Sequence, residues 1–129
     1  MKSIKTKITS DKTITIPGSK SVSHRMLICA SMADGTSIIR NILQSDDIHY
    51  TMSALSKMGA VIESIDDGLG SSSTIEDNNL TKDNIIIKVT GFNGKPKPYG
   101  NEIYLGNSGT SMRLLAGIAA LETSPYTLT

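Results

Sequence analysis

The sequence predicts a mixed α+β fold in which short strands alternate with three helices. Runs of alternating or β-branched residues, typical of strands, occur at residues 3–8, 13–16, 36–43, 61–65, 85–89 and 102–105. Three longer stretches place apolar residues at helical spacing and end near a glycine or a proline, at residues 21–33, 45–58 and 110–124. The predicted order of elements is therefore ββαβαβ(β)ββα.

The composition fits one globular domain. The chain has 129 residues, of which 38% are hydrophobic, and no apolar run is long enough to span a membrane. Thirteen Lys and Arg against 12 Asp and Glu give a formal net charge of +1, which argues against binding to nucleic acid or to an anionic membrane. The basic residues at 2–7 precede no apolar segment, so no secretory signal is predicted. The single cysteine, Cys29, is predicted to be a small core residue in a cytoplasmic protein.

Helical spacing also predicts which side chains face the core and which residues cap the helices. In the first helix the predicted inward residues are Val22, Met26, Cys29, Ala30 and Ala33. Ser45 is the predicted N-cap of the second helix, and Asp46 and Asp47 suit the positive end of its dipole.

The turn at residues 17–21 and the helix after it carry groups that suit a bound anion. A helix that begins after Gly-Ser presents unpaired backbone N–H groups and the positive end of its dipole. Lys20 adds a cation, Ser21 a hydroxyl and Arg25, one turn later, a planar guanidinium. A second interpretation, equally supported by the local pattern, is that Ser19 only caps the helix while Lys20 and Arg25 are solvated. The turn is not a Walker A loop, because Ser19 stands where that motif needs glycine.

A second glycine-containing turn precedes the third helix. Residues 106–109, Gly-Asn-Ser-Gly, would let backbone approach a ligand closely, and Arg113 follows one turn into the helix. Taken alone, this pattern is more typical of an ordinary turn from a strand to a helix, with Thr110 as the cap.

Together the two turns resemble a known pair of motifs. Residues 17–25 match P-G-S-K-S-x-S-x-R, residues 106–113 match G-N-[SA]-G-T-x-x-R, and residues 41–47 match N-x-L-x-S-D-D between them. In this order and spacing they resemble bacterial-type EPSP synthase (3-phosphoshikimate 1-carboxyvinyltransferase), an enolpyruvyl transferase. The resemblance implies repeated βαβαββ units in a two-lobed architecture that this chain contains only in part. Residues 1–19 would give strands to the first lobe, and residues 20–129 about one and a half units of the second.

The resemblance also implies a function and the residues that serve it. Members of this family transfer the enolpyruvyl group of phosphoenolpyruvate to the 5-hydroxyl of shikimate 3-phosphate and release phosphate. The residues implied for shikimate 3-phosphate are Lys20, Ser21 and Arg25, and those for phosphoenolpyruvate are Lys20, Asn107 and Gly109, with Thr110 and Arg113 as weaker candidates. No cofactor is implied, nor any nucleic-acid or membrane partner. The full-length enzyme is expected to be a cytoplasmic monomer.

The chain departs from the family pattern in two respects. His24 stands where many members have asparagine, Ser108 and Ser111 replace alanines, and Leu114 replaces a proline that some members have after the arginine. The chain is also far shorter than the family's, so the groups for proton transfer are expected outside it and the chain alone is expected to be inactive. A free-standing module that binds anions without catalysis is the alternative. His24 and His49 lack a His or Cys partner at ligand spacing, so no metal is predicted.

Overall fold

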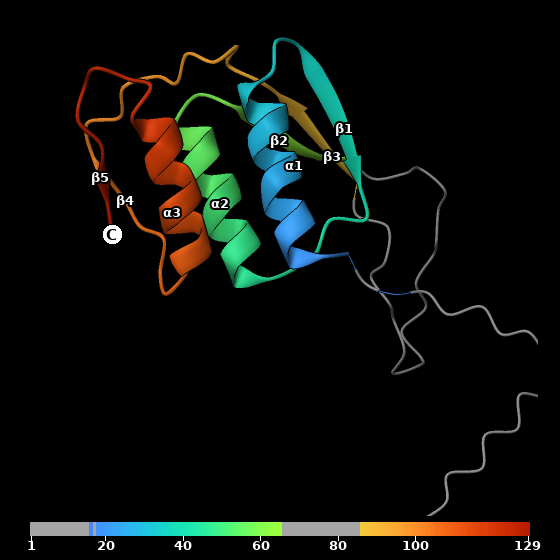
Figure 1. Ribbon diagram of the computed structural model, residues 1–129. Helices are drawn as coiled ribbons and strands as arrows, with labels where there is room; N and C mark the ends of the chain where they lie inside the picture. The colour runs from blue at the N-terminus through green and yellow to red at the C-terminus, as the bar shows by residue number, and fades with distance from the viewer. Residues whose placement is uncertain (1–15, 17, 66–85) are drawn as a thin grey trace, which may run out of the picture.

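The computed structural model describes residue 16, residues 18–65 and residues 86–129. These residues form a layer of three helices beside a three-stranded sheet, with a pair of very short strands next to the third helix (Figure 1). The elements in chain order are α1 (Lys20–Met32), β1 (Thr36–Arg40), α2 (Asp46–Lys57), β2 (Val61–Ile65), β3 (Ile86–Thr90), β4 (Glu102–Ile103), α3 (Gly109–Ala119) and β5 (Thr127–Leu128).

The larger sheet has β3 at its centre, antiparallel to β1 on one side and to β2 on the other. The edge strands β1 and β2 are therefore parallel to each other, and α2 connects them. Ile87 lies opposite Ile39, and Val89 lies opposite Ile62, in the register of the sheet. Ile87, Val89 and Ile39 are buried in the core, and α1 packs on β1 and β3 while α2 packs on β2.

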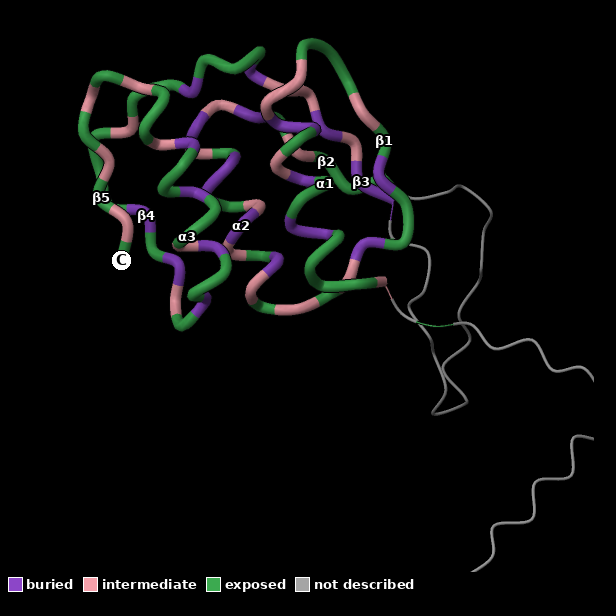
Figure 2. Tube along the Cα trace, in the orientation of Figure 1, coloured by how far each residue is buried: buried purple, intermediate pink, exposed green. Residues whose placement is uncertain are grey.

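The helix α2 lies between the other two helices and contacts both (Figure 1). Buried residues recur along all three helices and along β3, whereas the segment from Ala120 to the end of the chain has none (Figure 2). Of the described helices, none has the length and apolar character needed to cross a membrane.

The predicted elements agree with the structure in position and differ in detail. The mixed α+β class is confirmed, and strand β2 has the predicted bounds. The strand predicted at 102–105 shortens to Glu102–Ile103, where it pairs in parallel with β5, a strand that the sequence did not predict. The strands predicted at 3–8 and 13–16 lie, apart from residue 16, outside the described residues.

The predicted inward face of α1 is wrong at three of its five residues, whereas Ala30 is buried as predicted. Val22 and Met26 are 54% and 47% exposed, and Cys29 is exposed as well. The residues that are buried are Ser23, His24, Leu27, Ala30 and Ser31. This face is mostly polar, which apolar spacing could not identify. The Ser23 hydroxyl and His24 Nδ1 find their hydrogen-bond partners in segments distant in sequence, whereas the Ser31 hydroxyl has no partner among the described residues.

The carboxyl end of α1 is closed by the loop that follows β3. Backbone N–H groups of Phe92, Asn93 and Gly94 donate to the carbonyls of Ser31, Ala33 and Met32 at 2.8 to 3.1 Å. Gly91 makes this approach possible, since a Cβ there would lie 2.2 Å from the Ala33 carbonyl oxygen. The loop thereby satisfies carbonyls that the end of a helix leaves unpaired.

We expect Gly91→Ala to lower the free energy of unfolding by about 1 to 3 kcal/mol, because the added methyl must push the loop away from α1. Gly100→Ala is the matched control, since a Cβ there meets nothing within 4 Å. Urea denaturation followed by circular dichroism measures both variants. Equal stability of the two would contradict the close approach.

Candidate anion-binding site

The amino ends of the three helices lie at the same end of the helix layer. α1, α2 and α3 run in the same direction, and the start of α2 lies between the starts of the other two (Figure 1). Each helix carries a partial positive charge at its amino terminus. The parallel arrangement therefore concentrates positive potential along one edge of the structure.

The three amino termini differ in how far the chain itself satisfies them. At α2, Ser45 caps the helix by accepting from the Ile48 N–H, as predicted. The negative charges of Asp46 and Asp47 offset the partial positive charge of this helix end. At α3, the N-cap is Ser108, which accepts from the Ser111 N–H. The prediction that Thr110 is the cap is therefore wrong.

The amino terminus of α1 is the most open of the three. Ser19 occupies the N-cap position but its side chain makes no capping hydrogen bond, and the first turn contains no acidic residue. The interpretation that Ser19 acts only as a side-chain cap is therefore not supported. The first N–H groups of α1 have no capping side chain among the described residues, so they can donate to a bound anion.

The three residues predicted at this turn lie together on the first two turns of α1. The Lys20 ammonium forms an ion pair with the Asp47 carboxylate at the start of α2. The Arg25 guanidinium donates to the Ser21 hydroxyl at 2.9 Å. All three predicted side chains belong to exposed residues, so a ligand can reach the guanidinium and the ammonium by displacing water.

A close backbone contact fixes the turn before α1. A Cβ on Gly18 would lie 2.2 Å from the Asn41 carbonyl oxygen, so only glycine fits there. The Ser23 hydroxyl accepts from the Leu43 N–H at 3.0 Å. The segment between β1 and α2 therefore holds the start of α1 in place.

The two glycines of the second turn have different surroundings. Gly106 has a φ of +57°, which strongly favours glycine. A Cβ there would lie 2.7 Å from the Tyr50 ring, so any other residue would also displace that side chain. Gly109 has neither constraint, because a Cβ at that position meets no atom within 4 Å. The other candidates of this turn, Asn107, Thr110 and Arg113, are exposed.

Behind the two turns, four buried side chains join all three helices through hydrogen bonds. His24 Nδ1 on α1 lies 2.9 Å from Thr51 Oγ1 on α2, which lies 2.8 Å from Ser111 Oγ on α3. Ser111 Oγ also contacts Ser108 Oγ at 2.6 Å and donates to the Asp47 carbonyl at 3.3 Å. Burial, and secondarily the charge of Lys20, lowers the pKa of His24 below its ordinary value of 6.5.

Two residues of this region were not singled out as functional from the sequence. Asp47 was interpreted as a favourable charge for its own helix, although it lies within the matched N-x-L-x-S-D-D segment and pairs with Lys20. Thr51 lies outside the three segments that match the family motifs. Its position between Ile48 and Leu55 on the buried face of α2 is the signal that could have found it.

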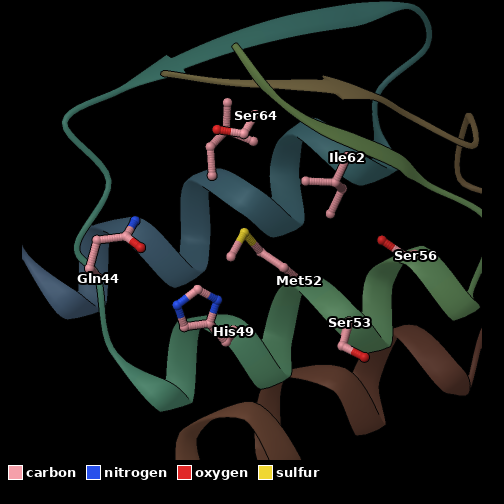
Figure 3. Close-up of a pocket in the computed structure, with 8 residues that line it drawn as sticks. Gln44, His49, Met52, Ser53, Ser56, Ile62 and Ser64 are labelled. Atoms are coloured by element: carbon pink, nitrogen blue, oxygen red, sulfur yellow. The ribbon is translucent and has the colours of Figure 1, made fainter. Parts of the chain in front are cut away.

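A separate pocket of about 310 Å³ lies between α2 and the larger sheet (Figure 3). The residues that line it are Gln44, His49, Met52, Ser53, Ser56, Ile62, Ser64 and Ile87. Its lining within the described residues contains no lysine or arginine, so those residues offer no cation to a phosphate group. Across the described ranges, no cluster of three His, Cys, Asp or Glu side chains could hold a metal ion.

Comparison with known proteins identifies the family. The family model of EPSP synthase (3-phosphoshikimate 1-carboxyvinyltransferase) matches residues 4–129. The chain belongs to the EPSP synthase family. In the structure, residues 18–25 of the first matched segment and residues 106–113 of the second lie at the amino ends of α1 and α3.

The relatives in this family include fungal and bacterial proteins. The chain is 41% identical over 119 residues to the pentafunctional AROM polypeptide of Schizosaccharomyces pombe, covering 92% of this chain and 7% of that protein. It is 38% identical over 112 residues to the 3-phosphoshikimate 1-carboxyvinyltransferase of Streptococcus uberis, covering 87% of this chain and 22% of that protein.

Solved structures support the same assignment. The EPSP synthase from Acinetobacter baumannii aligns with a TM-score of 0.68 and 31% identity, covering 89% of this chain and 23% of that one. The fold is therefore part of the EPSP synthase fold. The chain spans less than a quarter of the length of these relatives.

The lowered pKa of His24 predicts how stability depends on pH. The unfolded chain takes up the proton near the ordinary value of 6.5, whereas the folded chain takes it up only at lower pH. Stability from this residue is therefore present above pH 6.5 and is lost as the pH falls toward the folded pKa. We expect wild type to lose more stability than His24→Asn between pH 7.5 and pH 5, measured by urea denaturation. The exposed residue His49 provides the control His49→Asn, which should follow the wild type.

Proposed function

We propose that this chain forms one wall of a site for enolpyruvyl transfer from phosphoenolpyruvate to shikimate 3-phosphate. The observation that carries the proposal is the amino end of α1. No side chain of the described residues caps the helix there, and Lys20, Ser21 and Arg25 lie together on its first two turns. Membership of the EPSP synthase family supports the same activity. Both substrates carry phosphate, and phosphates bind well at the amino terminus of a helix.

Shikimate 3-phosphate would be held mainly by α1. The Arg25 guanidinium offers a planar pair of donors for a phosphate, and the Ser21 hydroxyl that it contacts lies one turn away. Lys20 begins the helix, so its ammonium lies near the N–H groups of the first turn. A doubly charged phosphate attracts the ammonium more strongly than one carboxylate, so we expect the ligand to compete with Asp47 for Lys20.

Phosphoenolpyruvate would lie against the start of α3. The open space beside Gly109 lets a ligand contact the backbone. Asn107 supplies an exposed amide in the same turn, and Thr110 and Arg113 stay weaker candidates. Lys20 would contact both substrates, because its ion pair with Asp47 places the ammonium at the start of α2, which lies between the starts of α1 and α3 (Figure 1).

Several parts of this proposal concern the whole enzyme. We assign no catalytic acid or base to this chain and expect it to bind substrate without turnover. The division into residues 1–19 for the first lobe and residues 20–129 for part of the second stays a prediction, as do a cytoplasmic location and a monomeric full-length enzyme.

The alternative, an anion-binding module, would bind inorganic phosphate as tightly as shikimate 3-phosphate, and calorimetric titration with both ligands separates the two hypotheses.

We expect the double variant Lys20→Ala, Arg25→Ala to lose at least about tenfold in affinity for shikimate 3-phosphate, since each charged hydrogen bond contributes about 1.5 to 3 kcal/mol. Isothermal titration calorimetry gives the dissociation constant. The control is Lys57→Ala, Lys95→Ala, which removes the same charge near the other end of the helices. Equal losses in both double variants would mean that the effect is general charge attraction and would reject the site.

We expect Gly109→Ala to weaken phosphoenolpyruvate binding without lowering stability, because the methyl enters space that the described residues leave empty. Gly117→Ala in the same helix also meets nothing within 4 Å and is the matched control. Thermal unfolding and a titration monitored by NMR measure both properties. If Gly109→Ala binds phosphoenolpyruvate as the wild type does, the assignment of this wall is wrong.

A further inference from the structure

Three of the residues that depart from the family pattern meet in one place. His24, Ser108 and Ser111 come from segments more than 80 residues apart, yet the structure joins all three through Thr51. All four side chains are buried. Breaking a hydrogen bond between buried groups is costly in free energy, because it leaves a donor and an acceptor without partners and away from water.

One arrangement of hydrogens satisfies every contact of this network. The Asp47 carbonyl can only accept, so the Ser111 hydroxyl hydrogen points to it. The Thr51 and Ser108 hydroxyls must then both donate to Ser111 Oγ. Because Thr51 has used its hydrogen, the remaining contact is made by His24 Nδ1–H, which donates to Thr51 Oγ1.

This assignment also accounts for the other ring nitrogen. His24 Nε2 is buried and has no hydrogen-bond partner among the described residues. In the Nδ1–H tautomer it carries only a lone pair, whereas in the other tautomer it would bury an N–H without an acceptor. The geometry therefore favours a neutral His24 with its hydrogen on Nδ1.

We propose that His24, Thr51, Ser108 and Ser111 are positioning residues, which hold the Lys20 turn of α1 and the Asn107–Gly109 turn of α3 at a fixed separation across α2. The role given to the two turns rests on the proposed function. The contacts form a closed path, because Asp47 accepts from Ser111 through its carbonyl and pairs with Lys20 through its carboxylate. Displacing either turn would break a buried hydrogen bond.

Protonation of His24 would disturb this arrangement. The imidazolium gains a second N–H at Nε2, where no described residue accepts it. Within the described part of the chain, the charged side chains near this end of the helices are Lys20, Arg25, Asp46, Asp47 and Arg113. Those on the strands that pack on α1 are Arg40 and Lys88. Of these, Lys20 acts on His24 and opposes its protonation.

The first test needs no ligand. The chain has two histidines, so ¹⁵N NMR can follow both rings, with His49→Asn to assign them. We expect the Nδ1–H tautomer for His24 at pH 7.5. As the pH falls, the amide signals of Asn107 and Gly109 should shift together with the His24 ring in the wild type and in His49→Asn, and should not do so in His24→Asn.

The second test removes the central hydroxyl. In Thr51→Val the side chain keeps its shape, so we expect His24 still to titrate while the amides of Asn107 and Gly109 no longer follow it. Thr51→Ser should restore the coupling, and Ser53→Ala on an exposed position of α2 is the control. If Thr51→Val does not fold, two measurements still test the proposal: the tautomer of His24 in the wild type, and the amide shifts of Thr51→Ser compared with those of His24→Asn. An Nε2–H tautomer, or amide shifts independent of His24, would overturn the proposal.

Binding measurements then separate this inference from the proposed function. We expect Thr51→Val to weaken shikimate 3-phosphate binding by about 2- to 30-fold, the range typical of residues that act through others, and Thr51→Ser to recover it. If the wild type does not bind shikimate 3-phosphate, the proposed function fails while the NMR result still decides the network. If Thr51→Val binds as the wild type does, these residues stabilise the fold without positioning the site.

Discussion

The hydroxyl group of Thr51 is the contact on which the arrangement of the three helices depends. It lies buried on α2 and bonds to His24 on α1 and to Ser111 on α3. A buried polar group that loses its partner costs about 1 to 3 kcal/mol. Sliding or rotating either outer helix would incur that cost, whereas a purely apolar interface would tolerate small shifts more readily. The polar contacts therefore specify the register of the helices as well as their packing.

That register gives one edge of the structure its electrostatic character. Three amino termini lie side by side, but the two aspartates of α2 offset its dipole and Ser108 closes the start of α3. The start of α1 keeps its donors accessible and adds Lys20 and Arg25. The ion pair between Lys20 and Asp47 is partly exposed, so it is weak enough for a competing anion to replace.

Local sequence was a good guide to elements that depend on local forces. The first helix was predicted at residues 21–33 and runs from Lys20 to Met32, because its limits follow from glycine and serine near its ends. The Ser45 cap was predicted correctly, since a capping hydrogen bond spans three residues. The local pattern after Gly18 indicated Lys20, Ser21 and Arg25 as candidates for an anion site, and helical spacing placed the second turn at the start of a helix. The family motifs added which substrates these residues are predicted to bind.

The sequence by itself determined the order of strands and helices and the two turns that resemble EPSP synthase, because spacing, glycine and capping act over a few residues. Only the tertiary structure decided which face of α1 is buried. Val22, Met26 and Cys29 were expected inside by their apolar character, yet the buried face holds Ser23 and His24. Polar side chains can be buried when partners satisfy them. Those partners, Leu43 for Ser23 and Thr51 for His24, lie 20 and 27 residues away, beyond the reach of any local pattern.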